Sequence, residues 1–123
     1  MSKILGIDYG SSKVGLALGD TELKLATPFK VISPAELVLT IEKLAEREEL
    51  VAVVMGLPLG MDGRDTEQTR AVREFAERLK KEISVDLEFE DERLSTAQAR
   101  KEGYDDAVAA MHILQSYLDR IYG

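Results

Sequence analysis

Carboxylates stand at points in this sequence where a divalent cation could be bound. Asp8 ends the apolar run between Lys3 and Ile7, which predicts a buried strand that delivers a carboxylate at its C-terminal end. Asp91 and Glu92 end a later strand in the same way. Sites in mixed α/β sheets usually lie at this edge, so we expect the strand ends to meet there. A turn-capping role is the alternative for Asp8.

A further pair of acids, Asp105 and Asp106, opens the last predicted helix, where the helix dipole favours acids whatever the function. Together with Asp8 and Glu92, this pair would complete the hard, all-oxygen cluster that Mg²⁺ or Mn²⁺ prefers. Such clusters can hold two ions about 4 Å apart that activate water and stabilise the leaving oxygen of a phosphodiester. No general-base histidine is then needed, and we expect His112, the only histidine, to be an ordinary helix residue.

The elements that position these acids follow from the hydrophobic pattern. Strands are predicted at residues 3–7, 14–19, 23–32, 50–55 and 85–90. Helices are predicted from Ser33, over about 65–81 and over about 105–121. Pro28 marks a bulge or an edge in the third strand. The order of three strands, helix, strand, helix, strand, helix predicts an α/β fold with a mixed five-stranded sheet, antiparallel at its start and parallel afterwards, with helices on both faces.

Length and composition restrict the class of protein. The 123 residues fit one domain, which we assign to residues 1–123. Because there is no cysteine, disulfides, thiolate metal sites and cysteine nucleophiles are excluded. No signal peptide or membrane span is evident, so we expect a cytoplasmic protein without membrane contact. The net charge of −7 argues against coating nucleic acid by bulk electrostatics, and any nucleic-acid contact must be local.

Polar residues near the acids allow two interpretations each. Arg93 could hold a phosphate through two hydrogen bonds or pair with a neighbouring acid. Ser95 or Thr96 could cap a short helix instead of contacting substrate. The loop over residues 56–63, rich in turn-forming residues, is expected beside the site.

A basic run follows this loop and also has two interpretations. It consists of Arg64, Arg70, Arg73, Arg78, Lys80 and Lys81. It could be a nucleic-acid-binding patch, but two acid–base pairs have the i,i+4 spacing of helical ion pairs: Glu74 with Arg78 and Glu77 with Lys81. A solvated, salt-bridged face is therefore the favoured interpretation.

These motifs together resemble the YqgF family, also called RuvX, whose members are described as candidate Holliday junction resolvases and candidate pre-16S rRNA nucleases. The resemblance spans essentially the whole chain. It rests on Gly6-Ile-Asp8-Tyr-Gly10 with Lys13, Gly15 and Ala17, on GLPLGMDG over 56–63, on DERLST over 91–96, and on Asp106 leading into AVAAMHILQSYL.

The resemblance implies an RNase H-like fold and an acidic triad, which fall here on Asp8, Glu92 and Asp106, as catalytic residues and as ligands of Mg²⁺ or Mn²⁺. Asp91 is the alternative to Glu92. If side chains alternate along the last strand, the two acids point to opposite faces, and the sequence leaves open which face binds the metal.

The implied activity is metal-dependent hydrolysis of phosphodiester bonds in nucleic acid, in 5′-end processing of pre-16S rRNA or, alternatively, in resolving branched DNA. For substrate binding we predict four residues, namely Tyr9, Lys13, Arg64 and Arg93. Tyr9 could stack on a base and the cations could contact phosphates. The protein is expected to be a monomer or a homodimer.

Two observations qualify the resemblance. Only residues 101–104 separate Arg100 from Asp105, whereas family members usually have a longer basic loop there. The first turn also resembles the phosphate loop of actin-like ATPases, but those enzymes bind nucleotide between two such domains and this chain supplies one. A non-catalytic RNA- or ribosome-binding module is the remaining alternative.

Overall fold

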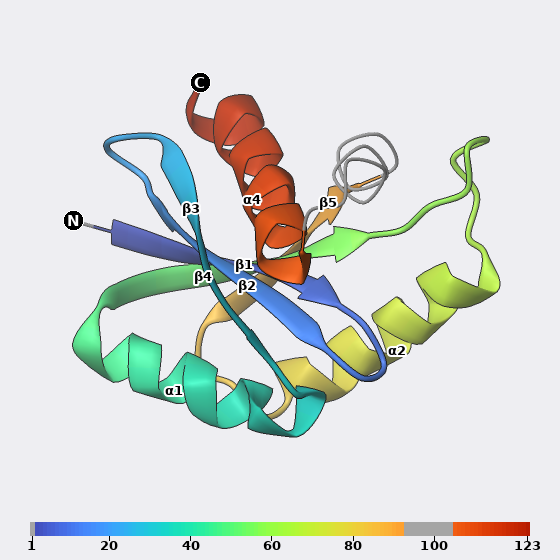
Figure 1. Cartoon of the computed structure of the whole chain (residues 1–123), viewed down its shortest axis with the longest axis horizontal. Coiled ribbons are helices and arrows are strands. Elements are labelled where there is room, and N and C mark those ends of the chain that lie inside the picture. Colours follow the sequence, from blue (N-terminus) through green and yellow to red (C-terminus); the bar gives the residue numbers. More distant parts are fainter. Residues whose placement is uncertain (1, 93–104) are drawn as a thin grey trace.

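The protein is built around one mixed sheet, seen in a computed structural model that describes residues 2–92 and 105–123 (Figure 1). Its five strands are β1 (Ser2–Tyr9), β2 (Val14–Asp20), β3 (Leu25–Ile32), β4 (Glu49–Leu57) and β5 (Asp86–Asp91). The strands lie in the order β3-β2-β1-β4-β5. β1, β2 and β3 pair antiparallel, whereas β4 pairs in parallel with β1, and β5 pairs in parallel with β4. The predicted mixed sheet is confirmed.

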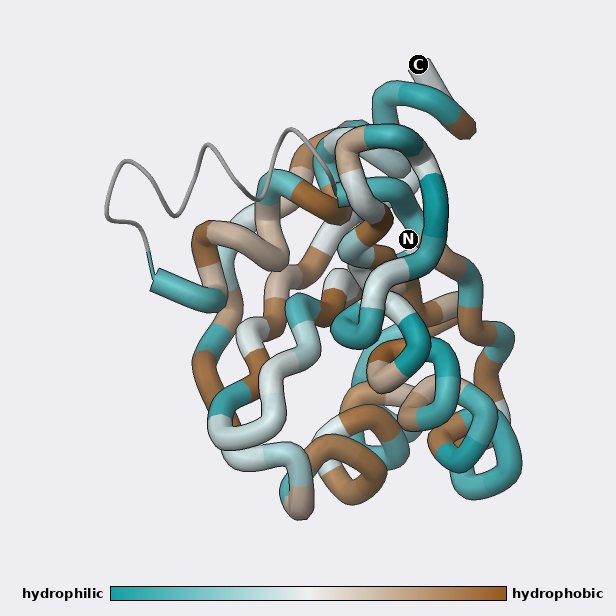
Figure 2. Tube along the Cα trace, turned by 90° about the vertical axis from the view of Figure 1, so that its right-hand side faces the viewer, coloured by the Kyte–Doolittle hydropathy of each residue, from teal (hydrophilic) through white to brown (hydrophobic). Residues whose placement is uncertain are grey.

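Helices cover both faces of this sheet, as predicted. The described helical segments are η1 (Pro34–Glu36), α1 (Leu37–Arg47), α2 (Glu67–Lys80) and α4 (Asp106–Tyr122). Because side chains alternate along a strand, Leu5 and Ile7 of β1 join a core with α1 and α2, whereas Ile4 joins a core with α4. Hydrophobic and hydrophilic stretches alternate along the helices in Figure 2, as expected when one side of each helix is buried.

The edge strand β3 confirms what Pro28 predicts. The register between β2 and β3 shifts after Leu16, which pairs with Lys30, so that Ala17 pairs with Pro28 and Phe29 is the extra residue. Since β3 also lies at the edge of the sheet, the backbone N–H group that proline lacks is not needed for a hydrogen bond to another strand. The predicted strand over 23–32 begins later than expected, at Leu25, after a turn in which Lys24 has a φ of 59°.

Helix α4 approaches the sheet more closely than side chains would normally allow. A Cβ atom at Gly6 would lie 2.7 Å from Cβ of Leu114, and one at Gly19 would lie 2.9 Å from Cδ2 of the same leucine. At Gly15 it would overlap the backbone carbonyl oxygen of Asp106. Glycines of β1 and β2 therefore form the surface on which α4 lies.

An ion pair between the buried Glu90 and the largely exposed Arg120 links the other side of α4 to β5. Glu90 is 6% exposed and accepts hydrogen bonds from Nη2 of Arg120 at 2.6 Å and from Oγ of Ser116 at 2.8 Å. Two residues earlier on β5, Glu88 accepts a hydrogen bond from the Tyr117 hydroxyl at 2.9 Å. Burial of the Tyr117 hydroxyl, followed by its bond to Glu88, raises the pKa of Tyr117 to about 12.

Replacing Gly15 by alanine should destabilise the protein, because the new methyl group would overlap backbone rather than a flexible side chain. We expect a loss of about 1–3 kcal/mol in the free energy of unfolding, typical of an overpacked core. Urea unfolding followed by circular dichroism measures it. A variant as stable as the wild type would show that α4 does not need this close contact.

Replacing Glu90 by glutamine should lower stability by about 1–2 kcal/mol, because Arg120 loses a charged partner but remains largely in solvent. The matched control is Glu88→Gln, which also changes a carboxylate bonded to α4 but at an exposed position. Thermal unfolding of both variants tests the contrast. A larger effect at residue 88 would contradict the assignment of Glu90 as the stronger link.

Candidate metal and nucleic-acid site

The carboxylate of Asp8 is placed by β1 at the C-terminal end of the strand, on the face covered by α4. Asp8 shares this face with Ile4 and Gly6, in keeping with alternation along the strand. Only 3% of Asp8 is exposed. Its antiparallel register partner is Gly15 of β2, the residue that lies directly beneath the start of α4.

Asp106 is brought beside Asp8 by this contact between α4 and Gly15. Both acids line a cavity of about 350 Å³, whose other walls are Gly10, Ser11, Ser12, Lys13 and Gln68. The preceding acid has a different role, because the Asp105 carboxylate accepts a hydrogen bond from the backbone N–H of Val108 at 2.9 Å and so caps α4.

Glu92 lies on the same face of the sheet as Asp8, and its place as a metal ligand instead of Asp91 stays a prediction. Glu88 and Glu90 both point to α4, so alternation turns Glu92 the same way, and its Oε2 occupies the space above Gly56 of β4. Gly56 follows Met55, the parallel partner of Ile7, and thus lies level with the residue after Ile7, which is Asp8.

Asp91 is exposed and follows Leu87 and Phe89 on the other face, where α1 and α2 pack. Asp8, Glu92 and Asp106 therefore lie on one face and at one end of the sheet. These are oxygen donors only, which suits a hard cation such as Mg²⁺ or Mn²⁺.

As the side chains stand in the described residues, no three carboxylate or imidazole groups lie close enough to hold one ion together. The acids share a face and an end of the sheet without forming a closed ligand set. A cation bound here would have to draw them closer, against the mutual repulsion that like charges experience without it.

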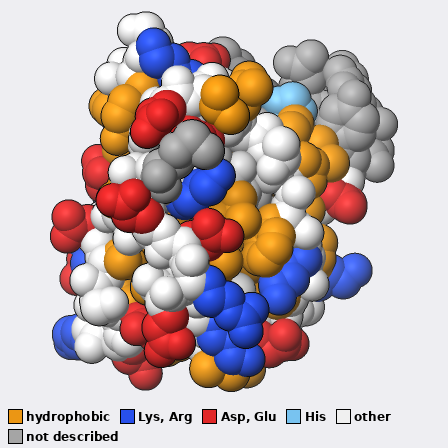
Figure 3. Space-filling model, turned by 90° about the vertical axis from the view of Figure 1, so that its left-hand side faces the viewer, with side chains coloured by type: hydrophobic (Ala, Val, Ile, Leu, Met, Phe, Trp, Pro, Cys, Tyr) orange, Lys and Arg blue, Asp and Glu red, His pale blue; other side chains and the backbone are white. Residues whose placement is uncertain are grey.

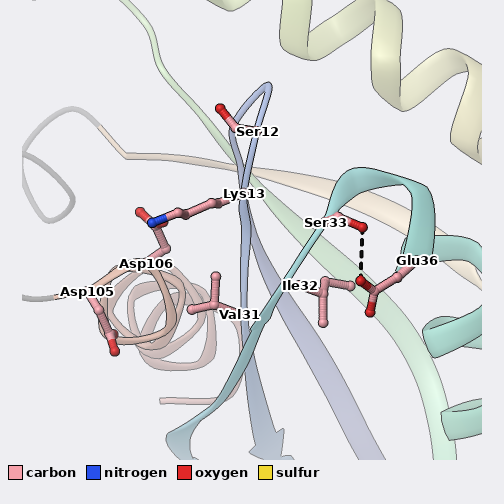
Figure 4. A pocket seen from close by; sticks show the side chains of 8 residues that line it. All are labelled: Ser12, Lys13, Val31, Ile32, Ser33, Glu36, Asp105 and Asp106. Carbon is pink, nitrogen blue, oxygen red and sulfur yellow. Dashed lines mark hydrogen bonds between the residues drawn. The ribbon is translucent and has the colours of Figure 1, made fainter.

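Lys13 stands between two cavities at this end of the sheet. Besides the one that contains Asp8, it lines a second of about 480 Å³ together with Ser12, Val31, Ile32, Ser33, Glu36, Asp105 and Asp106. Figure 4 shows the side chains of Lys13 and Asp106 pointing toward one another, with Val31 below them and Ser33 hydrogen-bonded to Glu36 on the far side. Lys13 therefore lies beside Asp106, and its contact with substrate stays a prediction.

Tyr9 lies elsewhere, because consecutive strand residues point to opposite faces. Its ring stacks on Phe75 of α2, with centroids 4.0 Å apart and planes 20° apart. One face of the ring is thus covered within the core of α1 and α2. The structure does not bring Tyr9 to the acids, and its stacking partner is a side chain of the protein itself.

The remaining predicted contacts divide between an exposed loop and residues outside the described part of the chain. Arg64 is exposed in the loop after β4, which extends away from the sheet (Figure 1), and its Nε lies 3.9 Å from Asp62. Arg93, Ser95, Thr96 and the short segment 101–104 lie outside the described residues. His112 is half-buried on α4.

The predicted ion pairs Glu74–Arg78 and Glu77–Lys81 are wrong. Among the described residues of α2, the pairs that form are Lys80 with Glu77 at 3.4 Å and Arg73 with Asp65 at 2.8 Å. The hydrogen bond from Arg73 lowers the pKa of Asp65. Helical spacing permits both i,i+3 and i,i+4 pairs. In α2, Glu77 and Lys80 form an i,i+3 pair, and Arg73 pairs with Asp65, which precedes the helix.

Gln68 is a site residue that the sequence analysis misses. It lines the cavity of Asp8 and Asp106 because the first turn of α2 is fixed to the end of β4. Thr66 caps the helix through Thr69, whose hydroxyl also donates to the carbonyl of Pro58. The sequence signal for this is the pair of threonines three residues apart, Thr66 and Thr69, because a cap at Thr66 means that the helix begins after Thr66 and not at residue 65.

Comparison with known proteins shows the family to which the chain belongs. Residues 2–120 match the family model described as "RuvX: Holliday junction resolvase". A protein of Rickettsia rickettsii (strain Sheila Smith) named "Putative pre-16S rRNA nuclease" is 38% identical over 96% of this chain and 86% of its own length. A protein of Rickettsia bellii (strain OSU 85-389) with the same name is 39% identical over the same shares of both chains.

Solved structures share the fold at low sequence identity. T. thermophilus RuvC, in complex with a Holliday junction substrate, has a TM-score of 0.56 at 15% identity, with 100% of this chain and 97% of that chain covered. The Fowlpox virus resolvase, also complexed with junction DNA, has a TM-score of 0.56 at 8% identity, with 98% and 99% covered. The sheet order and the two layers of helices are thus those of the RNase H-like resolvases, and the chain belongs to the RuvX family.

Proposed function

We propose that this protein is a metal-dependent endonuclease that hydrolyses phosphodiester bonds in RNA, in the 5′-end processing of pre-16S rRNA. The observation that supports this is that Asp8, Glu92 and Asp106 lie at one end of one sheet face. The names of the RuvX relatives support the reaction and the substrate. Processing of ribosomal precursors would take place in the cytoplasm.

The donor set fits Mg²⁺ or Mn²⁺, because all candidate ligands are carboxylate oxygens. Asp8 and Glu92 are only 3% and 6% exposed, so a cation here would be bound with little competing water. When bound, such ions activate a water molecule and stabilise the leaving oxygen of a phosphodiester.

The residues of the chain have separable tasks in this proposal. The three acids would hold the cation. Lys13, at the wall shared by the two cavities, attracts the phosphate that bears the negative charge of the substrate. Gln68, from the opposite wall of the first cavity, can donate a hydrogen bond to a phosphate oxygen without adding charge.

The surface charge favours a short single-stranded segment over a four-way junction. Acidic and basic side chains are interspersed on the face seen in Figure 3, and the whole chain has a net charge of −7. Four duplex arms of dense phosphate would need an extended basic surface, whereas a single strand needs few contacts. The solved resolvases support the fold and leave junction resolution as the second candidate.

Replacing Asp8 by asparagine should abolish Mn²⁺-dependent cleavage while the protein stays folded, because the change removes an anionic ligand and keeps the shape. Without divalent ions, the thermal stability of the variant should equal or exceed that of the wild type, since gathered carboxylates repel one another. Added Mn²⁺ should raise the Tm of the wild type only. A marked loss of stability would favour the turn-capping role of Asp8, and a Tm insensitive to Mn²⁺ in both proteins would contradict metal binding.

Cleavage of a 5′-extended 16S rRNA precursor should exceed cleavage of an intact four-way DNA junction under identical Mg²⁺ or Mn²⁺ and physiological salt. Single-turnover kinetics on both substrates, with the Asp8→Asn variant as the blank, measure the preference. Paired symmetric nicks in the junction by a dimer, without RNA cleavage, would assign the protein to recombination. Binding without any cleavage would identify a non-catalytic module.

A further inference from the structure

The second cavity continues the candidate site along the same face of the sheet. Asp8 pairs with Gly15, and Gly15 pairs with Val31, so these residues form one row across β1, β2 and β3. Two strand spacings, about 10 Å, separate the first residue of the row from the last. A strand whose phosphate lies at Asp8 would therefore reach Val31 with its next nucleotide.

The chemistry of this second cavity differs from that of the first. Its 480 Å³ are within the range of pockets that take small organic groups. Val31, which is 40% exposed, and Ile32 form an apolar wall beside the polar residues of the cavity. Exposed valine beside polar groups suits a sugar or a base, which has both apolar surface and hydrogen-bonding edges.

Charge argues against a phosphate deep in this cavity. Among the described residues, its walls include Glu36, Asp105 and Asp106 and one cation, Lys13, at the boundary. A phosphate would be repelled inside and attracted at the boundary. The neutral part of a nucleotide would enter, with its phosphate held near Lys13.

Resting on the nuclease function proposed above, we propose that this cavity binds the ribose and base of the nucleotide next to the cleaved bond and selects RNA over DNA. The selecting group is the pair formed by Ser33 and Glu36, in which the serine Oγ donates to Oε1 of the glutamate at 2.9 Å (Figure 4). Glu36 is exposed, and its carboxylate can accept a further hydrogen bond from a ribose hydroxyl. The 2′-OH is the group by which a protein distinguishes RNA from DNA.

The test is the affinity of a short single-stranded RNA relative to a DNA of the same sequence, measured by fluorescence anisotropy without divalent ions. Wild type should bind the RNA roughly three- to tenfold more tightly, as one hydrogen bond to a partly exposed charged group allows. In a Ser33→Ala, Glu36→Ala double variant this ratio should fall to about one through weaker RNA binding.

Glu46→Ala is the matched control, because it removes the same charge from an exposed position on α1 outside both cavities. It should leave the ratio unchanged, since a general charge effect acts on RNA and DNA alike. Val31→Ala should weaken both nucleic acids roughly threefold through lost apolar contact and keep the ratio. Circular dichroism establishes that each variant is folded.

Equal affinity of the wild type for RNA and DNA would overturn the proposal. The same holds if the ratio of RNA to DNA affinity is unchanged in the double variant, or if it falls by the same factor in Glu46→Ala. If the double variant does not fold, a Val31→Ala protein that binds both strands as well as wild type also overturns it. Cleavage of RNA with an unchanged ratio would refute the subsite and leave the nuclease function standing. Selective RNA binding without cleavage would refute the nuclease function alone.

Discussion

The close contact between α4 and the sheet is the constraint on which the candidate site depends. Gly6, Gly15 and Gly19 leave no side chain between the strands and the helix, so the helix backbone rests almost directly on β1 and β2. At Gly15 this brings the first residue of α4, Asp106, next to the strand that bears Asp8. A larger residue there would lift the helix, and the distance between the two acids would increase with it. The same absence of a side chain at Gly56 makes room for Glu92.

This geometry explains which parts of the fold the sequence could predict. The period-two pattern and the short apolar runs reflect which residues are buried, and they are visible in the sequence. The sheet, the mixed direction of its strands and the bulge near Pro28 could therefore be inferred. Asp8 could be proposed as a site residue because it ends a buried apolar strand. The boundary of α2 was missed by two residues, because capping by Thr66 is a local hydrogen bond that competes with several similar choices.

Other features depend on contacts between distant segments and could not be inferred. The face chosen by Glu92 is set by the partners of Glu88 and Glu90 on α4, and nothing within β5 specifies them. Tyr9 was expected at the substrate, but Phe75, far along the chain, occupies one side of its ring. The ion pairs of α2 differ from the predicted ones because Glu77 pairs with Lys80 instead of Lys81, and Arg73 pairs with Asp65 in the preceding loop. Arg93 lies outside the described residues, so its two interpretations stand as before.

Three acids in alternate positions on one strand pose an electrostatic problem that α4 resolves in part. Glu88, Glu90 and Glu92 all face the helix, and like charges on one face repel. The hydroxyl of Tyr117 meets the first, and Arg120 with Ser116 meets the second. These contacts use the C-terminal half of α4, whereas Asp106 stands at its N-terminal end beside Asp8. The C-terminal half of α4 thus supplies hydrogen-bond donors to Glu88 and Glu90, which stabilise the fold. Its N-terminal end supplies a further acid, Asp106, where a cation would be bound. Both roles reside on one helix, so the contacts that stabilise the fold and an acid of the candidate site belong to the same element.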